Sequence, residues 1–68
     1  MGLQTFTLTA TLGDRTRTHR WESADDASAT LDGTMIVMDR AYRDPVWARG
    51  RIELTDADGN VVQTMEAK

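Results

Sequence analysis

Residues 5–21 alternate between two kinds of side chain, with an interruption of two residues in the middle. Apolar residues take the even positions of 6–12 and threonine the odd positions of 5–11, and a second alternation over 15–21 follows Gly13-Asp14. A period of two places successive side chains on opposite faces of a strand, and Gly-X is a common two-residue hairpin turn. The pattern predicts a β-hairpin in which Leu12 pairs with Arg15, and Phe6 with Trp21 on the core face.

A helix is predicted to follow over residues 24–43. Ser23 is a favourable N-cap, Asp26 stands three residues later in the capping-box position, and Pro45 prevents continuation. The core-facing stripe is predicted to consist of Ala24, Ala27, Leu31, Met35, Met38 and Tyr42. An alternative stays open, because the turn signal Asp32-Gly33 and the residues 36–37 favour a helix ending near Asp32 and an extra strand.

Two further strands are predicted at the carboxyl end, over residues 46–55 and 61–65. The turn 56–60, Asp-Ala-Asp-Gly-Asn, joins them, with Gly59 in the left-handed conformation. Pairing Leu54 with Val62 then also pairs Ile52 with Thr64. The order ββαββ predicts a single α+β domain, residues 1–68, with one four-stranded, mainly antiparallel sheet and a single helix packed on one face.

Net charge, cysteine content and the length of apolar runs argue against several classes of protein. A net charge of −3 argues against a dedicated DNA-binding domain, so nucleic acid is an unlikely partner. The absence of cysteine excludes disulfides and thiolate metal sites. No apolar run approaches the roughly 20 residues of a membrane span, and the first residues lack the features of a signal peptide. The expectation is a soluble cytoplasmic protein without a membrane partner.

The basic residues are also unusual in kind. Seven of the eight are arginine, and alanine, aspartate and threonine are used heavily. In this compositional style the chain resembles small uncharacterised proteins of actinobacteria and their phages. The resemblance implies no particular activity, since no motif carries it.

The sequence shows no recognised catalytic or metal-binding pattern. His19 is the only histidine, and Ser23 is better explained as a helix cap than as a nucleophile. Asp56 and Asp58 resemble part of a calcium loop, but Leu54 and Met65 would occupy its first and last ligand positions. No catalytic residue, metal site or cofactor is therefore predicted, and the protein is expected not to be an enzyme.

Two surfaces are predicted to make contacts. One is the open sheet face, where threonines would be joined by Arg20, Trp47, Arg49 and Arg51. The other is the back of the helix, formed by Ala29, Gly33, Ile36, Val37 and Arg40, as a dimer interface. The hypothesis is a small protein-interaction module, a phage or bacterial accessory factor acting as a homodimer. The alternatives are nucleic-acid binding by the sheet face and, for that face, a plain solvated surface.

Overall fold

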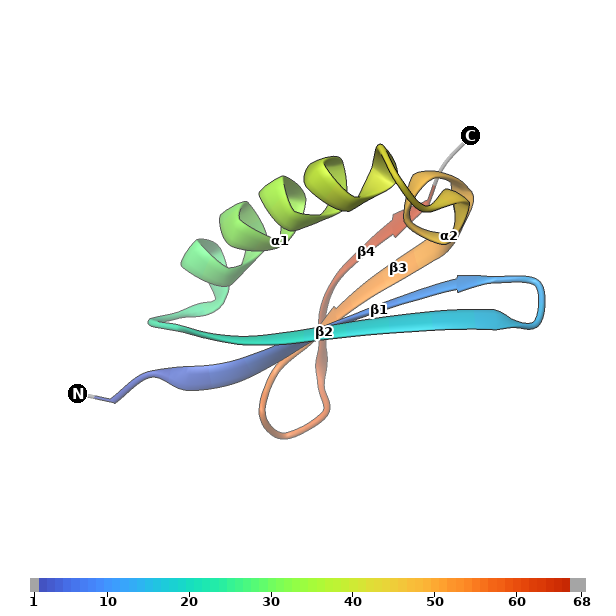
Figure 1. Ribbon diagram of the computed structural model, residues 1–68. Helices are drawn as coiled ribbons and strands as arrows, with labels where there is room; N and C mark the ends of the chain where they lie inside the picture. Colours follow the sequence, from blue (N-terminus) through green and yellow to red (C-terminus); the bar gives the residue numbers. More distant parts are fainter. Residues whose placement is uncertain (1, 67–68) are drawn as a thin grey trace.

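The computed structural model describes residues 2–66. One antiparallel sheet has the strand order β2-β1-β3-β4, and both helices lie on the same side of it (Figure 1). The predicted α+β class and the ββαββ order of the main elements are confirmed. The elements are β1 (Gln4–Leu12), β2 (Arg15–Ser23), α1 (Asp26–Ala41), α2 (Pro45–Arg49), β3 (Arg51–Thr55) and β4 (Val61–Glu66).

The β1–β2 hairpin has the predicted register. Leu12 lies opposite Arg15 and Phe6 opposite Trp21, and Gly13 takes the left-handed conformation with a φ of 63°. The rings of Phe6 and Trp21 have their centroids 6.3 Å apart, and the pair lies on the helix side of the sheet, since a Cβ atom at Gly33 of α1 would be 3.7 Å from Trp21. The register is well determined because a slip by one residue would move this pair to the opposite face.

The orientation of α1 is the reverse of the predicted one. Ala29 and Gly33 are buried, while the large apolar residues of the expected core stripe are exposed. A Cβ atom added to Gly33 would lie 3.6 Å from Leu8 and 3.7 Å from Trp21. The small residues therefore let the helix backbone approach the sheet closely, which a row containing Leu31 and Met35 would prevent. The buried core consists of Phe6, Leu8, Ala10, Ala29, Val46, Trp47, Ile52 and Leu54.

The N-cap of α1 is Asp25 and not Ser23 as predicted. The Asp25 carboxylate accepts a hydrogen bond of 2.8 Å from the backbone N–H of Ser28. Ser23 instead ends β2, and its hydroxyl donates to Asp32 on α1 over 3.2 Å. Since α1 is continuous from Asp26 to Ala41, the alternative with an extra strand after Asp32 is wrong.

The third predicted strand begins too early. Residues 45–49 form the short helix α2, and β3 starts only at Arg51. Asp44 caps α2 by accepting a hydrogen bond from the backbone N–H of Val46, and Pro45 occupies the first turn, where its fixed φ suits a helix. The Asp44-Pro45 pair therefore starts a new helix as well as ending α1.

The β3–β4 hairpin departs from its predicted register by one residue. Thr55 lies opposite Val61 as expected, but an irregularity between Leu54 and Thr55 pairs Leu54 with Gln63 and Ile52 with Met65. Gly59 has the predicted left-handed conformation, with a φ of 86°. A bulge inserts an extra residue on one strand. The alternation of apolar and polar residues along the sequence did not show where this extra residue falls. The shift brings Met65 to the core face, where it packs against the buried cluster.

Candidate functional site

The four residues predicted to form a contact surface on the sheet do not lie together. Arg20 and Arg51 are exposed on the face that carries no helix, opposite Thr7 and Thr11 respectively. Trp47 and Arg49 belong to α2 on the other side of the sheet. Trp47 is only 3% exposed and forms part of the core, so its predicted role as a surface anchor is wrong.

The open face is a polar grid without an aromatic anchor. The pairing registers place Thr5, Thr7, Thr9, Thr11, Thr16, Thr18, Thr55 and Thr64 on it. Arg51 forms an ion pair of 3.5 Å with Glu53 on the same face. The aromatic side chains of residues 2–66 all lie elsewhere, on the core face, in α2 or on α1. The open face therefore offers no aromatic side chain of residues 2–66 on which a base of single-stranded nucleic acid could stack.

The predicted helix back is also not a free surface. Ala29 and Gly33 are buried, and Ile36 and Val37 pack against the core cluster. Arg40 is half-buried and turned toward β2, where its guanidinium meets His19. The prediction that this row forms a dimer interface is wrong, because the sheet already covers it.

The solvent-facing side of α1 carries the large apolar residues instead. Four of them, named here the outer stripe, are Leu31, Met35, Met38 and Tyr42, which are 70%, 70%, 66% and 93% exposed. Their spacing of four, three and four residues places them on one side of a helix. Isolated exposed apolar residues are ordinary, but a contiguous patch indicates a contact surface.

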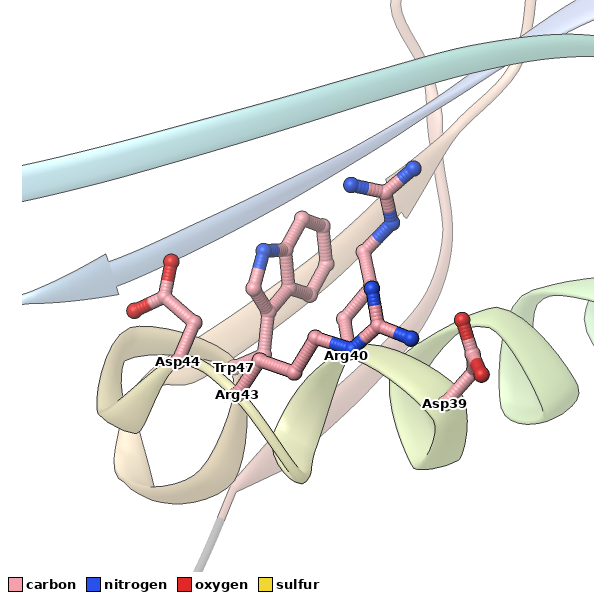
Figure 2. A pocket seen from close by; sticks show the side chains of 5 residues that line it. All are labelled: Asp39, Arg40, Arg43, Asp44 and Trp47. Carbon is pink, nitrogen blue, oxygen red and sulfur yellow. The ribbon is translucent and has the colours of Figure 1, made fainter.

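A second feature is a polar hollow where the end of α1 meets α2. We name it the arginine cleft; its volume is about 350 Å³, and it is lined by Asp39, Arg40, Arg43, Asp44 and Trp47. In the view of Figure 2, Asp44 and Asp39 lie at its two ends, with the indole and the two arginine side chains between them. The cleft thus combines two guanidinium groups with carboxylates and an indole.

One wall of the arginine cleft is fixed by an ion pair to β2. The Arg17 Nε donates to an Asp44 carboxylate oxygen over 2.9 Å. The hydrogen bond from the Val46 backbone N–H is the largest cause that lowers the pKa of Asp44 below 3.8; desolvation opposes the shift, and Arg17 and Arg15 reinforce it. Asp44 is therefore ionised at neutral pH. Its carboxylate accepts the capping hydrogen bond from Val46 and forms the ion pair with Arg17.

Arg40 is held in place from two sides. Its guanidinium approaches the His19 Nδ1 at 3.0 Å and lies over the Trp47 ring, with Cζ 5.8 Å from the ring centroid. An arginine can only donate, so the His19 Nδ1 is the acceptor of this bond. His19 in turn stacks on Trp21, with ring centroids 5.9 Å apart. These contacts hold the Arg40 guanidinium group in place between His19 and Trp47.

The arginine cleft was not found from the sequence. Arg40 was assigned to the wrong surface, and Arg17, His19 and Asp44 were not connected, because β2 and α2 are 27 residues apart at the Arg17–Asp44 pair. The helix-start signal Asp44-Pro45 was the one local clue, since it turns Trp47 back toward the sheet.

The described residues show neither a metal-binding cluster nor a membrane-spanning helix. Residues 2–66 contain no cluster of three or more side chains able to hold a metal ion, and neither described helix is long and apolar enough to cross a bilayer. No family model, curated protein or solved structure matches the chain. The outer stripe and the arginine cleft are the two most distinctive surface features of residues 2–66.

Proposed function

We propose that this protein is a small, non-enzymatic interaction module that functions as a homodimer through the outer stripe of α1. The observation that carries the proposal is the exposure of Leu31, Met35, Met38 and Tyr42 on a single helix face. A homodimer was also expected from the sequence, but through the opposite side of this helix.

The cost of leaving the outer stripe in water supports the proposal. Burying a large aliphatic side chain stabilises an assembly by roughly 1.5–3 kcal/mol relative to leaving it exposed. On a chain of 68 residues without cysteine, a second subunit is one of the few ways to add apolar burial. A stable interface needs about 800 Å² per partner, which the stripe and the residues beside it would have to supply together.

The spacing of the stripe favours a second copy as the partner. The midpoint of the four residues falls between Ile36 and Val37, and rotation about that point exchanges Met35 with Met38 and Leu31 with Tyr42. Two copies related by a two-fold axis through this midpoint would bring each apolar residue against an apolar residue of the other helix. Such an isologous contact, in which one patch meets its own copy, is the usual arrangement in a dimer.

The charges at the two ends of α1 support the same antiparallel arrangement. The helix begins with Asp25 and Asp26, and Arg43 directly follows its last turn. Antiparallel packing about the same midpoint places position 43 of one chain opposite position 30 of the other, one helical turn from Asp26, and it also opposes the two helix dipoles. Parallel packing would bring like charges together.

Light scattering on variants tests the interface. Met35→Arg places a charge next to the proposed two-fold axis, where it would lose water against apolar side chains, so we expect a mass near 7.6 kDa instead of twice that value. Thr18→Arg is the matched control, because Thr18 lies on the open sheet face and its replacement leaves an α1 interface untouched. Circular dichroism checks that both variants are folded.

Two results would contradict the proposal. A Met35→Arg protein that stays dimeric, together with a monomeric Thr18→Arg, would move the interface to the open sheet face. A wild-type mass near 7.6 kDa at micromolar concentration would exclude a homodimer under those conditions, and the outer stripe would then have to serve a different partner.

A further inference from the structure

We infer that the arginine cleft is a binding site for a small molecule that carries a single carboxylate. The site lies where the end of α1 meets α2, beside the edge strand β2, and Arg43 in its lining directly follows Tyr42 of the outer stripe. Binding there would not require the dimer. Its guanidinium groups would hold the carboxylate, and the hollow beside them would take the rest of the ligand.

The balance of charge around the cleft favours an anion. The cleft is lined by Arg40 and Arg43 against Asp39 and Asp44, and Arg17 on β2 adds a third guanidinium group through its ion pair with Asp44. The chain as a whole carries −3, so this positive excess is a local feature. Asp44 is already paired with Arg17. Among residues 2–66, Arg40 and Arg43 form no ion pair, which leaves both guanidinium groups able to bind an oxyanion.

The same balance favours one negative charge over two. Asp39 lines the cleft one helical turn before Arg43, a spacing at which opposite charges attract each other along a helix. It would offset part of the positive charge and oppose a phosphate dianion. A carboxylate has the planar, two-oxygen geometry that a guanidinium group binds with paired hydrogen bonds.

The size and stiffness of the hollow suit a small ligand. Its volume of about 350 Å³ lies at the lower end of the range usual for small-molecule sites, roughly 300–1,000 Å³. Arg40 is already ordered by His19 and by the Trp47 ring. Preorganisation of this kind lowers the entropic cost of binding.

Nuclear magnetic resonance titration with benzoate tests the inference directly. The chain has two tryptophans, so the indole N–H of Trp47 reports on the cleft and that of Trp21, which donates to Asp32 over 3.3 Å, serves as an internal reference. Benzamide is the neutral control of the same shape, and inorganic phosphate at constant ionic strength tests the charge class. We expect a saturable shift of the Trp47 signal with benzoate alone.

Variants then assign the binding to the cleft. Arg43 is exposed, so Arg43→Gln should fold normally and weaken benzoate binding by about tenfold or more, the usual effect of losing a charge-assisted hydrogen bond. Arg20→Gln, on the open sheet face, is the matched control and should bind like the wild type. Equal shifts with benzamide, tighter binding of phosphate, or unchanged binding in Arg43→Gln would each overturn the inference.

Discussion

Replacing Gly33 with alanine is expected to stabilise the protein, although Gly33 is buried between α1 and the sheet. Its added Cβ would lie 3.6 Å from Leu8 Cδ2, 3.7 Å from Trp21 Cη2 and 3.8 Å from Leu8 Cδ1. All three distances are ordinary van der Waals contacts, so the methyl group fits without displacing its neighbours. Inside a helix, alanine is favoured over glycine by about 0.8–1.0 kcal/mol, and burying one more carbon adds up to about 0.8 kcal/mol.

The expected gain of about 1–2 kcal/mol corresponds to a rise in melting temperature of at least about 4 °C for a domain of this size. Thermal denaturation followed by circular dichroism measures it, at a fixed protein concentration because self-association also shifts the midpoint. Gly50→Ala is the contrasting control: its Cβ would lie 2.6 Å from the Thr11 carbonyl oxygen and also against the Val46 carbonyl. That variant should lose about 1–3 kcal/mol or more through overpacking. A lower midpoint for Gly33→Ala would mean that α1 does not lie on the sheet as described.

Three further outcomes follow from the same structure. Trp47→Ala should cost about 3–5 kcal/mol in unfolding free energy, since the side chain is 3% exposed; a near-native denaturation midpoint would place Trp47 outside the core. Leu31→Ala should change the unfolding free energy of the monomer by less than about 0.5 kcal/mol, because Leu31 is 70% exposed; a larger loss in dilute solution would mean that α1 is rotated. The pKa values of Asp25 and Asp44 are lowered from 3.8, chiefly by hydrogen bonds from the Ser28 and Val46 backbones respectively. Their carboxylates therefore stabilise the fold above that pH, and stability should fall as the pH drops below about 4; Asp44→Asn should make that fall shallower in urea titrations at successive pH values.

The β1–β2 hairpin could be predicted from the sequence because every local signal agreed. Alternation over residues 5–21 and a two-residue turn at Gly13-Asp14 leave one register that buries Phe6 and Trp21 together. A shift by one residue would have exchanged the faces completely. Arg20 and Arg51 were likewise placed on the open face correctly, since strand alternation determines their side.

The side of α1 that packs on the sheet could not be predicted in the same way, because both sides of this helix carry apolar residues. Hydrophobicity favours the stripe of Leu31 and Met35, whereas the structure buries the row of Ala29 and Gly33. The deciding quantity is the distance at which the helix backbone packs on the sheet, and it depends on Leu8 and Trp21 beneath it. This distance depends on tertiary packing, so it cannot be read from the spacing of apolar residues along the helix.

The prediction for residues 44–50 was wrong for a different reason. The same error kept the arginine cleft from being predicted. Asp44-Pro45 was interpreted only as the end of the preceding helix, although an acidic cap followed by proline is equally a signal to begin one. With α2 in place, Trp47 turns into the core and Asp44 reaches Arg17 on β2. Because this helix start was missed, Trp47 and Arg49 were predicted on the wrong side of the sheet.

The two proposed surfaces of α1 can be separated by experiment even though Arg43 stands close to both. In the antiparallel dimer Arg43 would lie one helical turn from the acidic start of the partner helix, while in the cleft it would hold the carboxylate of the ligand. Exposed ion pairs contribute only about 0–1 kcal/mol, whereas each apolar residue of the outer stripe contributes more than that when buried. Arg43→Gln should therefore weaken benzoate binding and leave the dimer mass unchanged, and Met35→Arg should do the reverse. If either substitution abolished both properties in a folded protein, the cleft would be completed by the second subunit and the two surfaces would form one site.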